Sequence, residues 1–320
     1  MTQHRLGGAG LPRGTGNKPA GNGSGRPVAR RVAKTALVAL ATVVVGGAAM
    51  YGLGLLRGHV REAPTHQVSA ASLRLVKGPA WMTPAILAEL DVGLLDPEFP
   101  QQFSLLDDGV LRRIAAAYET CVWVERVERI VKHDPRVDAS RPPLEIYLKF
   151  HRPAAFVESR GGFCLVDSGG VRLPGVYREP RLGGVELLVI SGVTSGPPNV
   201  GQVWSDARLD AGVRVAEAVG PKRRLFHLAS VDVSNVGGRS DPRETEIALF
   251  TDNGTRIKWG KAPTRDAALL QEKTPDEKVA YLDFVYKHLN GQVDGVLAYI
   301  DIPNETVRRR PAGTGTRLRS

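Results

Sequence analysis

The side chains in this sequence best suited to metal binding or acid–base chemistry are its seven histidines, at positions 4, 59, 66, 133, 151, 227 and 288. They are scattered, and none belongs to an H-E-x-x-H motif or to another pair at the short spacing of metal ligands. His133 and Asp134 are adjacent, but neighbouring residues at a strand end point to opposite faces, which argues against an acid–base pair. We therefore expect no metal site and no cofactor.

Nucleophile motifs are missing as well. The sequence contains no G-x-S-x-G turn that would expose a serine. The two cysteines, Cys121 and Cys164, are too few for a disulfide framework or a zinc site. We interpret them as small buried side chains, and a single Cys121–Cys164 bridge stays open as an alternative if this region lies outside the cytoplasm. The sequence thus predicts a protein that is not an enzyme and has no small-molecule substrate.

Positive charge is concentrated at the N-terminus. The chain of 320 residues carries 43 Lys and Arg against 33 Asp and Glu, a net charge of +10. The first 34 residues contain no acidic side chain but several basic ones: Arg5, Arg13, Lys18, Arg26, Arg30, Arg31 and Lys34. The rest of the chain is nearly neutral, which argues against nucleic acid as a partner. Because residues 1–34 are also rich in Gly, Pro and Asn, we expect a disordered basic tail there.

An apolar segment follows this tail. Residues 35–56 contain no charged side chain, and as a helix they would extend about 33 Å, enough to cross a membrane. A cleaved signal peptide is the alternative, but its apolar region is usually about 7–15 residues long. We expect an uncleaved single transmembrane helix. The basic residues just before it predict a cytoplasmic N-terminus and an extracytoplasmic main body.

Periodicity after the apolar segment predicts an α+β fold in two parts. The first part, residues 66–152, has the order β-α-α-β-β, with two amphipathic helices on one face of a small sheet. Its expected elements are a strand at His66–Val76, helices at Pro84–Leu90 and from Asp107 or Asp108 to Tyr118, a strand in the segment CVWVERVERI, and a strand at Leu144–Phe150. The second part, residues 153–304, is expected to be rich in strands, with helices at Asp206–Ala218 and Pro275–Leu289. Asn253-Gly254 predicts a hairpin turn within it.

These elements, in this order, resemble the FtsQ/DivIB family of bacterial cell-division proteins. CVWVERVERI is similar to the family's P-W-V-x-x-A-x-V-x-R strand, with Cys121 in place of the usual Pro. PPLEIYLKFHRPAAF is similar to P-x-x-L-x-I-x-V-x-E-R-x-P-V-A, with His151 in place of the Glu. Four later segments also resemble family motifs: CLVDSGGVRLP, LVISGV, NGTRIKWG and YIDI. The chain departs from the family at Pro303-Asn304, where Arg with Tyr or Phe is common, and in a long loop, DPRVDASRPP.

The resemblance implies a POTRA domain at residues 66–152, which is a protein-docking unit, and a β-domain at residues 153–304. It implies a non-enzymatic single-pass scaffold of the cytoplasmic (inner) membrane that links divisome proteins at the septum. The implied partners are FtsB/DivIC-like and FtsL-like coiled-coil proteins. The alternative is a POTRA-bearing protein of export or envelope assembly. Within the POTRA domain, we interpret Trp123 as a core residue packed against the helix that carries Ile114 and Tyr118.

The C-terminal strand region, Gly295–Asn304, is the predicted partner-binding element, with the preceding helix as its support. A fully paired inner strand is the alternative. A terminal strand is expected to be a sheet edge with unpaired backbone groups, which can accept a strand from another chain. Alternation in VLAYIDI predicts Val296, Ala298 and Ile300 in the core and Leu297, Tyr299 and Asp301 outside, and Pro303 should end the docking strip near Ile302. The predicted partner-binding residues are Leu297, Tyr299, Asp301 and Ile302. Residues 305–320 are expected to be a disordered basic tail.

Overall fold

The structure of the protein is a computed structural model that describes residues 26–62, 66–75, 78–133, 137–138, 140–261 and 272–310. The chain has a mixed α+β fold and divides into two compact units, Met1–Thr65 and His66–Ser320.

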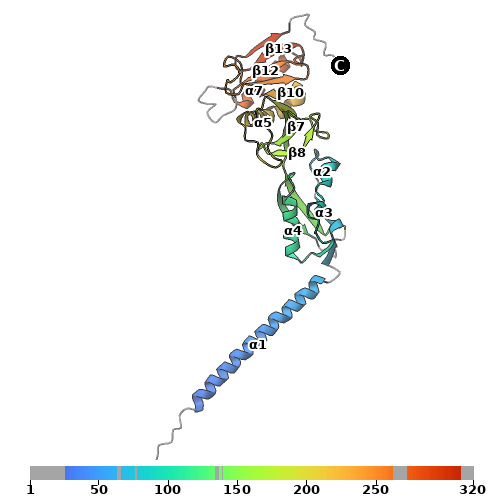
Figure 1. Ribbon diagram of the computed structural model, residues 1–320, viewed down its shortest axis with the longest axis vertical. Coiled ribbons are helices and arrows are strands. Elements are labelled where there is room, and N and C mark those ends of the chain that lie inside the picture. The colour runs from blue at the N-terminus through green and yellow to red at the C-terminus, as the bar shows by residue number, and fades with distance from the viewer. Residues whose placement is uncertain are drawn as a thin grey trace, which may run out of the picture. The chain divides into compact units, whose positions relative to one another are not determined.

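The first unit contains one long helix, α1 (Arg26–Glu62), drawn in blue in Figure 1. Its segment Lys34–His59 is long and apolar enough to cross a membrane. The expected span, residues 35–56, lies inside it. The helix begins earlier than expected, so the prediction of disorder is wrong for residues 26–34. Pro27 is compatible with a helix that starts here, because proline needs no amide hydrogen in the first turn. Residues 1–25 of the expected tail lie outside the described residues.

The second unit starts with two short strands where one was expected. β1 (Gln67–Ser69) pairs with β3 (Gln102–Ser104), whereas β2 (Arg74–Leu75) pairs in parallel with β5 (Leu144–Phe150). A 3₁₀ turn, η2 (Ala70–Ser72), separates β1 from β2. The hydroxyl of Ser69 accepts from the amide of Ala71, and that of Ser72 donates to the Ser69 carbonyl, so side chains compete here with strand pairing.

The expected helices and central strands of this part are present. α2 (Pro84–Ala88) and α4 (Asp108–Glu119) begin after Thr83 and Asp107, whose side chains accept hydrogen bonds from the first turn. β4 (Val124–Lys132) pairs antiparallel with β5, which gives a three-stranded sheet of order β2-β5-β4. The short helix α3 (Val92–Leu95) and strand β3 were not predicted. The order β-α-α-β-β is therefore incomplete as a description of residues 66–152.

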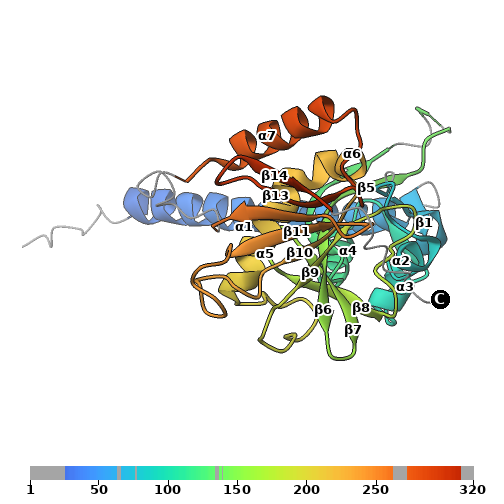
Figure 2. The ribbon, with the colours of Figure 1, turned by 90° about the horizontal axis from the view of Figure 1, so that it is seen from above.

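The remaining strands form one nine-stranded sheet of order β14-β13-β12-β11-β10-β9-β6-β7-β8. Figure 2 shows its strands from β9 to β14 following one another. The strands are β6 (Pro153–Ser159), β7 (Gly162–Asp167), β8 (Arg172–Tyr177), β9 (Leu188–Ser191), β10 (Leu228–Asp232), β11 (Ile247–Thr251), β12 (Arg256–Gly260), β13 (Leu297–Asp301) and β14 (Thr306–Arg309). The expected Asn253-Gly254 turn joins β11 to β12, with Gly254 at a φ of +78°.

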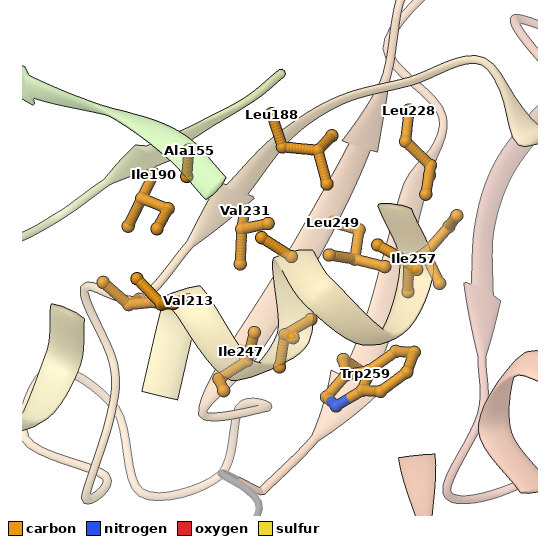
Figure 3. Packing of buried hydrophobic residues seen from close by; sticks show 14 of the residues in the cluster. Ala155, Leu188, Ile190, Val213, Leu228, Val231, Ile247, Leu249, Ile257 and Trp259 are labelled. Atoms are coloured by element: carbon orange, nitrogen blue, oxygen red, sulfur yellow. The ribbon is translucent and has the colours of Figure 1, made fainter. Parts of the chain in front are cut away.

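Helices α5 (Ala207–Val219) and α7 (Pro275–His288) correspond to the two that were expected in this part, and α6 (Arg223–Phe226) is an additional single turn. Side chains of α5 and α7 pack on the sheet, in a core that includes Val213 and Leu282 together with strand residues such as Val231, Leu249 and Trp259. Figure 3 shows Val213 of α5 together with the strand residues Val231, Leu249 and Trp259. Burial of this apolar surface is the main stabilising contribution to the fold.

Strands β6 and β7 contribute to two cores at once. Their alternate side chains separate, so that Val157 and Cys164 join the core under α5, whereas Phe156 and Leu165 join the core of residues 66–150. A hydrogen bond joins His151 to Asp167, with 2.6 Å between Nδ1 and Oδ2, where β5 passes into β6. The expected boundary near residue 152 therefore marks a change of sheet inside one compact unit.

Candidate docking surface at the C-terminal edge of the sheet

The strand that was expected to end the sheet is an inner strand. β13 pairs in parallel with β12 and antiparallel with β14, so the edge of the sheet is β14. The prediction that residues 295–304 form the open edge is wrong. So is the prediction of disorder from residue 305, as far as Arg309.

A tight turn explains the extra strand. β13 ends before Pro303, as expected of a residue without an amide hydrogen. Oδ1 of Asp301 accepts hydrogen bonds from the backbone amide and the side-chain amide of Asn304, at 3.0 and 3.1 Å. Glu305 takes a left-handed φ of +52°, which helps to reverse the chain. Pro303 marked the strand end in the sequence, but it did not show that the chain returns.

The four predicted partner-binding residues are not all accessible. Leu297 and Ile302 are fully buried, and Asp301 is 7% exposed, so the structure does not present these three as an outer strip. Tyr299 is half-buried and lies on the face away from the helices. Val296, expected in the core, is 44% exposed.

A register irregularity between Leu297 and Tyr299 accounts for this pattern. Strand alternation would place these two residues on one face, but the irregularity adds one residue to β13 relative to β14. Leu297 and Ile300 consequently both enter the core. Tyr299 and Asp301 remain on the opposite face, as predicted, although Asp301 is covered by its neighbours.

A row of side chains crosses the open face of the sheet beside β14. Cα partners in successive strands are Phe250 with Arg256, Arg256 with Tyr299, and Tyr299 with Arg308. Directly opposed residues in neighbouring strands have side chains on the same face. The row therefore alternates aromatic and cationic groups over four strands and ends at the edge. We call these four residues the aromatic–basic row.

Two carboxylates offset part of the positive charge on this face. Glu244 Oε2 lies 3.1 Å from Arg256 Nη2 and 3.5 Å from Lys258 Nζ, and Asp301 Oδ2 lies 3.9 Å from Lys258 Nζ. The Lys258 ammonium also lies 5.4 Å from the centroid of the Tyr299 ring. Arg308 is exposed and has no ion-pair partner among the described residues. Arg309 is the Cα partner of the buried Leu297 and therefore belongs to the other face. An extended segment with acidic side chains would complement this surface.

The two edges of the nine-stranded sheet differ in their capacity to pair. β8 contains Pro174, which has no amide hydrogen, and Gly175 at a φ of +95°. Both features interrupt a regular ladder. β14 has the sequence TVRR without Pro or Gly, and its four residues are exposed. Among the described strands of this sheet, β14 is thus the edge suited to accept another strand.

Two side chains noted in the sequence, Trp123 and His133, contact neighbouring residues of the fold. Trp123 is 2% exposed and belongs to the same core as Ile114 and Tyr118, which confirms its interpretation as a core residue. His133 Nε2 lies 3.2 Å from Glu145 Oε2. Asp134, its sequence neighbour, lies outside the described residues.

Both cysteines are free and buried, and they belong to different cores. The alternative of a Cys121–Cys164 bridge is therefore not the arrangement found. Burial raises the pKa of the Cys121 thiol, and the backbone amides of Trp123 and Val124 offset only part of this effect.

No protein-family model matches the chain, and no curated protein matches its sequence.

Proposed function

We propose that this protein is a non-enzymatic, single-pass membrane scaffold of the bacterial division septum that binds partner proteins through strand β14. The sequence resemblance to the FtsQ/DivIB family is the source of the division role and of the FtsB/DivIC-like and FtsL-like coiled-coil partners. The proposed location is the cytoplasmic membrane, with the N-terminus in the cytoplasm and residues 66–310 outside.

The observation that carries the docking part of the proposal is the open edge of β14 beside the aromatic–basic row. A strand added to this edge would gain backbone hydrogen bonds, and its alternate side chains would lie next to Arg308, with Tyr299 one strand further in on the same face. The proposed docking strand is therefore β14, one strand further out than the predicted β13. Tyr299 is retained in the proposed site, and Val307 and Arg308 are added to it.

A proline substitution at Val307 tests this docking mode. The amide of Arg310 donates to Val296 O at 3.1 Å, toward β13. Because strand amides alternate in direction, those of Val307 and Arg309 point away from β13. Val307→Pro therefore removes an outward donor while it leaves the inward bonds of β14 in place. We expect co-purification of the coiled-coil partner to fall at least tenfold, with little change in melting temperature.

Val307→Thr is the matched control, because it keeps the amide and the β-branched shape. It should bind the partner as the wild type does. The docking mode is refuted if Val307→Pro and Tyr299→Ala both retain wild-type binding in a folded protein.

Fluorescent tagging tests the division role separately. A band at mid-cell in dividing cells supports it. Uniform envelope fluorescence at all stages would instead favour the alternative, a POTRA-bearing protein of export or envelope assembly.

A further inference from the structure

Three side chains with metal-ligating atoms converge at one end of the nine-stranded sheet. His227 directly follows α6, Asp252 lies in the β11–β12 turn, and Asp294 precedes β13. One ligand atom of each lies within 4.8 Å of those of the other two, and His227 Nδ1 is 4.0 Å from Asp252 Oδ2. His227 and Asp252 are exposed and Asp294 is half-buried, so an ion can reach all three from solvent.

The backbone holds the three residues in place. The amide of Asp252 donates to the carbonyl of His227 at 2.8 Å. The two carboxylate oxygens of Asp294 accept from the backbone amide and the side-chain amide of Asn253, at 2.9 and 2.7 Å. Each oxygen keeps a further lone pair, and such supporting bonds orient a carboxylate toward a metal.

We propose that His227, Asp252 and Asp294 form a binding site for a divalent transition-metal ion of the zinc class. One imidazole and two carboxylates provide the nitrogen and oxygen ligands that Zn²⁺ accepts, whereas the hard ions Mg²⁺ and Ca²⁺ prefer oxygen alone. Ligands of a tetrahedral zinc ion with bonds of 2.0–2.1 Å lie about 3.3 Å apart. Rotation of exposed side chains closes the remaining distance, and a water molecule completes the tetrahedron.

The ion also relieves an unfavourable arrangement of charge. Two carboxylates within 4.8 Å of each other repel, and a bound cation would offset both. It would join three segments that are distant in sequence, and the site is independent of the proposed docking function.

Metal titration of the untagged full-length chain in detergent tests the site. We expect Zn²⁺ to bind and to raise the melting temperature. His227→Asn removes the imidazole, and asparagine tolerates the left-handed φ of +52° at this position. This variant should bind Zn²⁺ at least tenfold more weakly and should lose the rise in melting temperature.

His288→Asn is the matched control, because it removes an exposed histidine outside the cluster. It should behave as the wild type does. Asp294→Asn provides a second test that keeps the shape of the side chain, and it should also weaken binding. Equal Zn²⁺ affinity and stoichiometry in the wild type, His227→Asn and Asp294→Asn would overturn the proposal.

Discussion

Hydrogen bonding to a single exposed carboxylate explains how Trp123 is accommodated next to a strand with many charged residues. Its indole Nε1 donates to Glu89 Oε2 at 2.9 Å, and its ring centroid lies 5.9 Å from that of Trp81. The apolar body of the side chain is thus buried while its polar atom reaches a partner at the surface. At the residue scale, this pairing joins the segment before β4 to the end of α2.

Trp123→Phe is expected to lower the free energy of unfolding by about 1–3 kcal/mol, because it removes buried surface and the hydrogen bond to Glu89. Urea unfolding of the full-length chain in detergent, followed by circular dichroism, measures the effect. Glu89→Gln keeps an acceptor and should cost less than Trp123→Phe. Equal stability of wild type and Trp123→Phe would show that the indole is not a stabilising contact.

The two thiols are expected to react slowly in the folded protein. The raised pKa of Cys121 lowers its thiolate fraction, and burial restricts access to both sulfurs. Iodoacetamide at pH 8 should label neither cysteine in the native protein within the time that labels both in urea. Detection of only oxidised cysteine by mass spectrometry, without a reductant, would contradict the arrangement of two free thiols.

At the element scale, α5 depends on a network at its first turn. Asp206 accepts from the amides of Arg208 and Leu209, and its other carboxylate oxygen accepts from the Ser195 hydroxyl at 2.6 Å. Ser195 in turn accepts from Trp204 Nε1 at 2.8 Å. Burial would raise the pKa of the Asp206 carboxyl, but the bonds from Ser195 and the backbone amides outweigh it, so this pKa is lowered.

Asp206→Ala should therefore reduce stability by about 0.5–2 kcal/mol, the usual effect of losing a helix cap. Folding lowers the pKa of Asp206. The Asp206 charge therefore contributes fully to the stability of the folded protein above the unfolded pKa of about 3.9. It is lost as the pH falls through the lower folded value. We expect the free energy of unfolding, measured with urea, to differ less between wild type and Asp206→Asn at pH 3 than at pH 6. A difference that does not change with pH would contradict this account.

Strand β14 was not predicted from the sequence. The pattern TVRR is short and carries two arginines, and it follows Pro303, so it resembles a solvated tail. Its pairing depends on the turn held by Asp301 and Asn304 and on the free edge of β13. Neither feature is visible in the local sequence.

At the scale of the whole molecule, the distribution of charge around α1 determines the expected topology. Because basic residues flank the N-terminal side of Lys34–His59, residues 66–310 should lie outside the cytoplasm. Alkaline phosphatase fused after Ser320 should be active, and green fluorescent protein fused at the same place should be dark. The opposite pair of results would overturn this topology.

Elements whose signals are local could be predicted from the sequence. The apolar segment of α1, the helices that became α2, α4 and α5, and the Asn253-Gly254 turn were all predicted from neighbouring residues. These local predictions agree with the structure because helix ends and tight turns are set by backbone conformation and short-range hydrogen bonds.

Long-range pairing, in contrast, sets which strand is the edge of the sheet and which side chains contact one another. The irregularity in β13 reversed the expected place of Leu297, and the return of the chain at Pro303 made β14 the edge. His227, Asp252 and Asp294 came together because neighbouring strands and loops bring distant residues to one end of the sheet. Strand register and loop convergence depend on long-range pairing, which is set by the packing of the whole sheet and not by spacing along the chain.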